Sequence, residues 1–347
     1  MDGFRRAAIG PGSIGGMDLP ACVRLARHTP VVAPAAGVRA LGCDPATALV
    51  VEDLAPPLAG LLDRLVAPAA TPDVLADAAA LGVPAAVTGG LLRELHVAGA
   101  LVDADREDRA RQALSRACVT VHGRGPLVGG IVIGLALAGA GTVHTVTGGQ
   151  VRPGEVATGL ATADVGRSRL AGIRAALARS VPGRTTGPPP ARSVPDLAVL
   201  ADERPDPVLV GALHRDGVPY LRVALRDGRG IVGPLVLPGR TACLRCLDRH
   251  AEDTEPWWPA LVDALAGRAG AADPVCAAAT AAFATGQALM LLEGLGAGAP
   301  PAAALGAVLD LDVAAGTVTR RPCAPHPRCP CRGATSGPGG DRGTIEG

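Results

Sequence analysis

Two sets of closely spaced cysteines constrain this chain more than any other feature of its sequence. Cys243 and Cys246 are separated by two residues and follow the apolar run 230–237, and further metal-ligand residues stand near the end of the chain. A structural zinc ion takes four ligands, commonly as two short-range pairs from separate segments. The two segments are therefore expected to meet in one folded domain.

The C-terminal region supplies more ligands than one site needs, namely Cys323, His326, Cys329 and Cys331. We predict that a structural zinc ion is bound by Cys243, Cys246, Cys329 and Cys331. Either Cys323 or His326 could replace one of these ligands, and unliganded or redox-active cysteines are the alternative to a metal. Because four protein ligands leave no open position, the site would stabilise the fold and would not catalyse a reaction.

The other cysteines give no sign of a catalytic thiol. We expect them to be small apolar residues, and they are Cys22, Cys43, Cys118 and Cys276. The total of nine is odd, and the short spacing of the paired cysteines suits metal chelation better than a disulfide framework. This pattern suits a reducing compartment and predicts a cytoplasmic protein.

Composition excludes several classes of partner. The length of 347 residues suggests two domains, and 48% hydrophobic residues are enough for sizeable cores. All 33 basic residues are arginines and oppose 32 acids, so no overall field attracts nucleic acid or an anionic membrane. Residues 1–20 do not resemble a secretory signal. The apolar run 127–143 contains several glycines, and we expect a buried helix there, not a membrane span.

Residues 35–103 predict a small α+β domain of winged-helix type, after a poorly defined segment 1–34. The pattern gives a hairpin (38–42 and 47–51), three helices (57–66, 71–82 and 88–99) and a short strand (100–102). We expect Thr71 and Thr88 to cap the second and third helices. The third helix offers only Arg93 and His96 to DNA, which disfavours DNA binding. A peptide added as a strand at the hairpin edge is the preferred function, and a purely structural cap is the alternative.

A charged linker helix (104–117) then leads to a larger domain (118–332) that opens like a nucleotide-binding α/β unit. A buried strand at 118–121 is followed by a glycine-rich turn and an apolar helix. Gly123 and Gly125 fit the first two positions of G-x-G-x-x-G, but Val128 holds the third position and Gly129 comes one residue late. The second strand, 142–146, ends at Thr147 without the acid that usually binds ribose, so the motif is a weak indication of a nucleotide.

The rest of this domain alternates strands and helices. We predict strands at 196–201, 220–225 and 230–237, a hairpin at 307–313 and 317–321, helices at 166–179, 207–214 and 276–292, and a helical region from 257. The segment 181–190 is rich in proline and glycine and predicts a flexible surface connection. The tail 333–347 is predicted to be disordered.

Three short motifs give the chain a family resemblance. They are the run 163–169, which reads Ala-Asp-Val-Gly-Arg-Ser-Arg, the stretch 233–246 with its Cys-Leu-Arg-Cys end, and the run His-Pro-Arg-Cys-Pro-Cys at 326–331. Together with the glycine turn, they resemble the ThiF/MoeB/HesA-type ubiquitin-activating-like superfamily. They are most similar to the actinobacterial ThiF-like component of thiazole/oxazole peptide cyclodehydratases. The resemblance covers about residues 35–332 and implies a Rossmann-like ThiF-type sheet with a zinc knuckle.

The resemblance implies an adenylation site that this chain only partly retains. Active members of the superfamily bind ATP with a ribose-binding Asp, an Arg, a Lys in a D-x-G-x-x-K run, and an Asp for magnesium. This chain contains no lysine, and Arg169 stands at the position of that Lys. Asp202 remains as a possible magnesium ligand. The residues that could hold a nucleotide are Gly123, Gly125, Gly129, Arg169 and Asp202.

The resemblance leads to three functional hypotheses. The first is an adenylation-deficient docking component that binds the leader of a precursor peptide for a YcaO-type partner. The second is an active ATP-dependent adenylyltransferase that acts on the C-terminus of a carrier protein. The third is a scaffold without a peptide client. A homodimer is implied by analogy alone.

Overall fold

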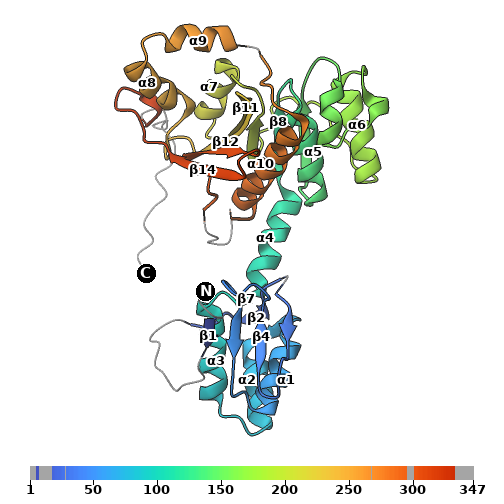
Figure 1. The fold of residues 1–347 in the computed structure, drawn as a ribbon, viewed down its shortest axis with the longest axis vertical. Coiled ribbons are helices and arrows are strands. Elements are labelled where there is room, and N and C mark those ends of the chain that lie inside the picture. Colours follow the sequence, from blue (N-terminus) through green and yellow to red (C-terminus); the bar gives the residue numbers. More distant parts are fainter. Residues whose placement is uncertain (1–4, 8–17, 28, 267, 295–300, 333–347) are drawn as a thin grey trace. The chain divides into compact units, whose positions relative to one another are not determined.

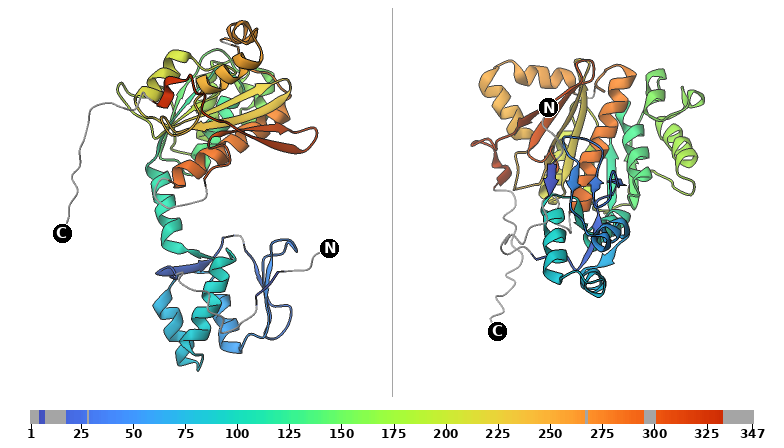
Figure 2. Two further views of the ribbon diagram at one scale, coloured as in Figure 1. Left: turned by 90° about the vertical axis from the view of Figure 1, so that its left-hand side faces the viewer. Right: turned by 60° about the horizontal axis from the view of Figure 1, so that its bottom comes forward.

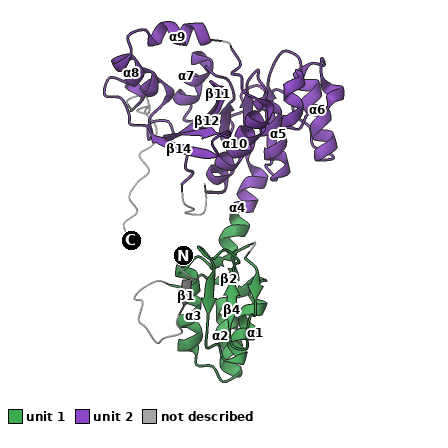
Figure 3. Cartoon of the chain, viewed as in Figure 1, with its two compact units in different colours: residues 1–109 green, residues 110–347 purple. Residues whose placement is uncertain are grey.

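The computed structural model describes residues 5–7, 18–27, 29–266, 268–294 and 301–332. The chain divides into two compact units, residues 1–109 and 110–347 (Figure 3). Helix α4 (Ala104–Arg116) has almost the bounds of the predicted linker helix and crosses this division. The predicted disordered tail 333–347 lies outside the described residues, and so do residues 1–4 and 8–17 of the segment 1–34.

The described residues of unit 1 form two small sheets and the helices α1 to α3 (Figure 1). The strand orders are β1-β5-β4-β3 and β6-β2-β7. The strands are β1 (Arg5–Ala7), β2 (Cys22–Leu25), β3 (Val31–Val32), β4 (Arg39–Leu41), β5 (Leu49–Val51), β6 (Ala69–Ala70) and β7 (Leu101–Asp103). The helices are α1 (Pro56–Arg64), α2 (Thr71–Ala80) and α3 (Ala85–Val97).

The predicted leucine faces form the core of unit 1. Leu58, Leu61 and Leu62 of α1 are buried, because positions i, i+3 and i+4 share one face of a helix. Leu92 and Leu95 of α3 are fully buried in the same cluster. The predicted hairpin also forms, as β4 and β5.

The structure corrects both predicted helix caps. Helix α3 begins at Ala85, directly after Pro84, so Thr88 lies one turn inside the helix and is buried. Thr71 is the first residue of α2, and its hydroxyl donates to the Pro20 carbonyl oxygen. In both helices a proline beside the first turn fixes the start, which a threonine was expected to do.

The predicted peptide site at the hairpin edge is also wrong in its location. Strand β4 pairs with β3 on its outer side, and β5 pairs with β1 in parallel. Both edges of the hairpin are therefore occupied by strands of the chain itself. Among the described residues, the outer strands of this sheet are β1 and β3.

Unit 2 is built on a seven-stranded mixed sheet in the order β14-β13-β12-β11-β10-β8-β9. Strands β9, β8, β10 and β11 are parallel, and β12, β13 and β14 continue the sheet antiparallel. The strands are β8 (Cys118–His122), β9 (Thr142–Val146), β10 (Leu197–Leu200), β11 (Tyr220–Arg226), β12 (Arg229–Val236), β13 (Ala307–Asp312) and β14 (Thr317–Pro322). This is the predicted Rossmann-like α/β architecture.

Helices cover both faces of this sheet. They are α5 (Leu127–Leu137), α6 (Arg169–Ser180), α7 (Pro207–Arg215), α8 (Leu244–Thr254), α9 (Trp258–Leu265) and α10 (Pro274–Gly294). In β10, Leu197 and Val199 join the core formed with α5, α6 and α10, whereas Ala198 and Leu200 join the core formed with α7 and the cysteines. The alternation explains why these parallel strands are apolar on both faces.

Glycines allow α5 and α10 to pack closely (Figure 2). A Cβ on Gly130 would lie 2.9 Å from the Cβ of Ala281, and a Cβ on Gly134 would lie 2.9 Å from Oγ1 of Thr285. The first part of the run 127–143 therefore forms the predicted buried helix, which ends at Leu137, and residues 142 and 143 already belong to β9. Helix α10 is long and apolar enough to cross a membrane by length and composition alone, but half of the tested stretch is buried inside the structure.

Two parts of unit 2 differ from the prediction. Helix α8 was not predicted, because few of its side chains are apolar. The segment 181–190 is not a loose connection: Thr186 is buried, its hydroxyl donates to the Val143 carbonyl oxygen at 2.7 Å, and Gly187 accepts from the Thr145 backbone N–H at 2.8 Å. The outer edge of β9 is thereby covered.

Candidate functional site

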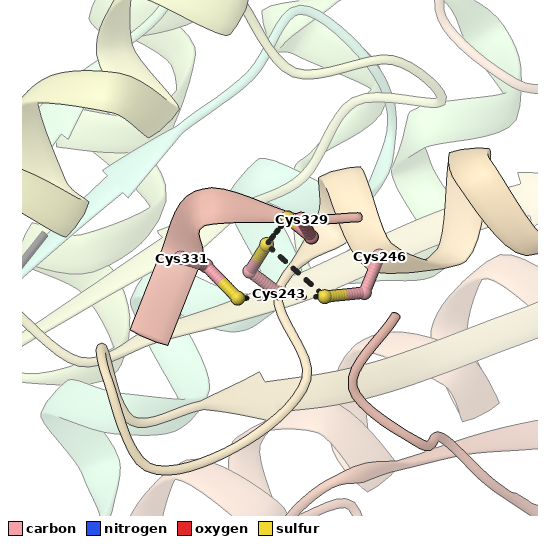
Figure 4. A group of neighbouring side chains, drawn as sticks. All are labelled: Cys243, Cys246, Cys329 and Cys331. Atoms are coloured by element: carbon pink, nitrogen blue, oxygen red, sulfur yellow. Dashed lines mark hydrogen bonds between the residues drawn. The ribbon is translucent and has the colours of Figure 1, made fainter. Parts of the chain in front are cut away.

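The four cysteines that the sequence singled out come together on one face of the sheet (Figure 4). Their Sγ atoms all lie within 4.8 Å of one another. The Cys243 sulfur lies 3.7 Å from those of Cys246 and Cys329, and the Cys246 sulfur lies 3.5 Å from that of Cys331. Cys243 precedes α8, Cys246 lies in its first turn, and Cys331 lies in the 3-10 turn η3 (Pro330–Arg332).

These distances suit a tetrahedral metal ion. With Zn–S bonds of about 2.3 Å, the edge of a regular tetrahedron of sulfurs is about 3.8 Å. Burial raises the pKa of the Cys243 thiol and that of Cys331, the latter to about 11. Buried thiolates therefore need a nearby positive charge, which a metal ion supplies. The group could bind a metal such as zinc.

The two alternative ligands have other partners. His326 is buried, its Nε2 lies 2.8 Å from a carboxylate oxygen of Asp253, and its Nδ1 accepts from the backbone N–H of Arg328. The Cys323 thiol donates to the carbonyl oxygen of Arg321. His214 supports the cluster from α7, because its Nε2 lies 3.0 Å from the Cys331 carbonyl oxygen.

A cavity of about 1310 Å³ opens at the carboxyl ends of the parallel strands. Strands β9 and β10 lie on opposite sides of β8, so the strand order reverses there, and folds of this type bind ligands at that place. The wall at this end includes His122, Gly123, Arg124, Thr147, Gly148 and Asp202.

Gly123 and Asp202 shape this wall together. A Cβ on Gly123 would lie only 2.7 Å from the carbonyl oxygen of Ala201, so the close approach of the turn to the end of β10 requires glycine. The backbone N–H of Arg124 donates to Oδ1 of Asp202 at 2.9 Å. Burial raises the pKa of the Asp202 carboxyl group, and the hydrogen bond from Arg124 opposes that shift. Asp202, the possible magnesium ligand of the sequence analysis, thus lines the cavity.

The other predicted nucleotide residues do not line the cavity. A Cβ on Gly125 would lie 3.1 Å from the Cβ of Ala269, and one on Gly129 would meet Leu160 at 3.4 Å. Gly129 therefore faces Leu160 and not the cavity. Arg169 is directed into the protein and not into the cavity wall.

Arg169 forms a buried ion pair that the sequence did not reveal. Its Nε and Nη2 donate to the two oxygens of Glu155 at 2.9 and 2.8 Å. Nη2 also donates to the carbonyl oxygen of Gln150 at 2.8 Å, and Nη1 donates to that of Gly148. Both side chains of the pair are 4% exposed. The guanidinium thus holds the loop after β9 in place.

A second polar group lies farther along the cavity wall, where β11 faces α8 and α9. Arg204 and Trp258 both donate to Oδ1 of Asp248, at 2.6 and 3.2 Å. Arg222 lies on β11, and burial lowers its pKa to about 10. The sequence did carry a signal for this group, because Arg222 interrupts a strand that is otherwise buried and apolar.

Comparisons with known proteins show what the fold resembles. No family model matches the chain, and no curated protein matches it. Among solved structures, Escherichia coli MccB with ATP has a TM-score of 0.66 at 15% identity, over 89% of this chain and 99% of that one. The microcin C7 biosynthetic enzyme MccB with N-formylated MccA gives 0.65 at 14%, over 90% and 99%. PaaA gives 0.50 at 15%, over 68% and 80%.

At this level of identity the comparisons show the fold alone. The chain has the fold of MccB, which is ThiF/MoeB-like, and this confirms the fold that the motifs implied.

Proposed function

We propose that this chain is a ThiF-like docking component, deficient in adenylation, that binds the leader of a precursor peptide. It would present the peptide to a YcaO-type cyclodehydratase that forms thiazole or oxazole rings. The observation that carries this proposal is the ion pair between Arg169 and Glu155. Arg169 stands where the resembling enzymes have a phosphate-binding lysine, and its donors are already engaged.

Adenylation needs positive charge at the phosphates in the transition state, where one well-placed donor contributes about 3–4 kcal/mol. Four contacts hold the Arg169 guanidinium to Glu155 and to the loop after β9. Thr147 and Gly148 line the cavity where the ribose-binding carboxylate is expected. Two ATP contacts are therefore missing together, and their combined loss supports a docking role.

A peptide partner is supported by the fold and by unit 1. MccB has been solved with the peptide MccA. In this chain the outer strand β3 offers a sheet edge, and Val32 in it is 44% exposed. A peptide strand added to β3 would gain main-chain hydrogen bonds without requiring a charged sequence. Zinc at Cys243, Cys246, Cys329 and Cys331 would stabilise unit 2.

ATP–pyrophosphate exchange with magnesium tests the docking role. We expect no exchange above a protein-free control, and none in Arg169→Lys, because a single ammonium group would still face Glu155. Robust exchange by the native chain would overturn the docking role. Co-purification of the chain with a YcaO-type protein and a short precursor peptide would support the partner assignment.

An active ATP-dependent adenylyltransferase is the second candidate, because Gly123 and Asp202 do line the cavity. It would act on the C-terminal carboxylate of a carrier protein. This candidate predicts exchange that disappears in Asp202→Asn, since the neutral amide is a poor magnesium ligand. A homodimer is compatible with either candidate function, and light scattering would measure the oligomeric state.

A further inference from the structure

Arg204 has two buried hydrogen-bond donors without a partner in the described part of the chain. The residue lies in the loop after β10 and lines the cavity. Its Nη1 donates to Asp248 at 2.6 Å, and its guanidinium carbon lies 5.0 Å from the centre of the Trp258 ring. Nε and Nη2 are buried and have no hydrogen-bond partner among the described residues. A buried donor without a partner costs about 1–3 kcal/mol, so an acceptor is expected here.

Nε and Nη2 form one edge of the guanidinium, and this edge fits both oxygens of a carboxylate. The chain itself shows the fit twice. Arg39 donates from Nε and Nη2 to the two oxygens of Asp63, at 2.8 Å each. Arg169 does the same to Glu155, at 2.9 and 2.8 Å. A carboxylate therefore matches the free edge of Arg204 in geometry.

The charges around Arg204 favour a group with one negative charge. Arg222 lies 3.6 Å from the Glu203 carboxylate, and Nε of Arg226 donates to the same carboxylate at 2.7 Å. With Arg204 and its partner Asp248, the cluster has three arginines and two acids. Within these five side chains one positive charge remains, which a carboxylate would balance and a doubly charged phosphate would exceed.

We propose that this end of the cavity binds a carboxylate of the client peptide on Nε and Nη2 of Arg204. The inference rests on the proposed function, because it takes the client to be a peptide. The cavity has room for residues of the peptide beside its carboxylate. Small-ligand pockets usually measure about 300–1,000 Å³, and this cavity measures about 1310 Å³. Both donors have almost no exposed surface, so binding requires α9 to move, and no side chain of α9 is fully buried.

Binding of short peptides to the full chain, followed by tryptophan fluorescence, tests the proposal. Trp258 stacks on Arg204 and therefore reports directly on the site. The probes are N-acetyl-Ala-Ala-Ala as the free acid and as the amide, and N-acetyl-Ala-Asp-Ala-amide with its Asn counterpart. We expect at least one acid to bind about tenfold more tightly than its neutral counterpart, the gain typical of a charged hydrogen bond. The first pair reports a terminal carboxylate and the second an acidic side chain.

Arg204→Gln is expected to abolish the preference for the acid. Arg240→Gln is the matched control, because Arg240 is exposed and lies outside the cavity wall. If circular dichroism shows that Arg204→Gln is unfolded, Arg204→Lys replaces it, because lysine keeps the charge but lacks the two-donor edge. That variant should lose most of the preference.

Four results would each overturn the proposal. They are equal binding of the acid and its neutral counterpart in both pairs, a preference of undiminished size in Arg204→Gln or Arg204→Lys, stronger binding of inorganic phosphate than of either acid, and no binding of any acid up to about 50 mM. The proposed function fails separately: pyrophosphate exchange would refute docking without altering the carboxylate preference of Arg204.

Discussion

Glu155→Gln should destabilise unit 2 strongly, because it leaves the Arg169 guanidinium buried without a countercharge. Both side chains are 4% exposed, so water cannot replace the lost partner. The glutamine amide group would also point an N–H donor at a donor of Arg169. Removing one partner of a buried ion pair costs about 3–5 kcal/mol. For a unit of this size, 1 kcal/mol corresponds to about 2–4 °C, so the Tm should fall by about 6–20 °C.

Urea denaturation followed by tryptophan fluorescence measures this cost. Both tryptophans, Trp257 and Trp258, lie in unit 2, so the signal reports that unit. Asp312→Asn is the control, because its partner Arg229 is 38% exposed. A pair at that exposure contributes about 0–1 kcal/mol. Adding Arg169→Gln alone and with Glu155→Gln completes a double-mutant cycle, which isolates the energy of the pair.

The reasoning is refuted if Glu155→Gln costs no more than Asp312→Asn. Arg169 would then not be held by its partner, and it could turn to a phosphate. The main argument for an adenylation-deficient site, which is that Glu155 holds Arg169 away from the phosphates, would then be lost.

Two further predictions concern the metal and the helix contact. Cys246→Ala should lose bound zinc in elemental analysis. Cys43→Ala should retain it, because Cys43 is exposed and lies outside the cluster. Equal zinc contents in the two variants would contradict the assignment of the ligands. Gly134→Ala should lower the unfolding free energy by about 1–3 kcal/mol through its clash with Thr285. Gly286→Ala, which meets no atom within 4 Å, should raise it by about 0.5–1 kcal/mol, and the same sign for both variants in urea denaturation would refute the packing argument.

Local patterns were enough for much of unit 2. Strand β9 has the bounds that the sequence predicted, because a short run rich in Val and Thr between glycine-containing turns has few alternatives. The cysteine cluster was predictable because chelation specifies which distant residues must meet. In both cases the chemistry of a few residues determines the local structure.

Contacts without a local pattern could not be predicted. Glu155 and Arg169 are 14 residues apart, and irregular 3-10 turns between them carry no periodicity. Strand β2 is four residues long and takes both its partners, β6 and β7, from later in the chain. The covered hairpin in unit 1 has the same cause, since β1 and β3 are too short to show a strand pattern.

The cysteine cluster has a consequence for the helices between its two halves. Most of α8, helices α9 and α10 and the final hairpin lie between Cys246 and Cys329, so a metal ion there would close this length of chain as a cross-link does. Asp248, which orients Arg204, lies in α8 directly after the first cysteine pair. A ligand that moves α9 and a metal that anchors α8 would therefore be thermodynamically linked, and each would change the affinity of the other by the same factor.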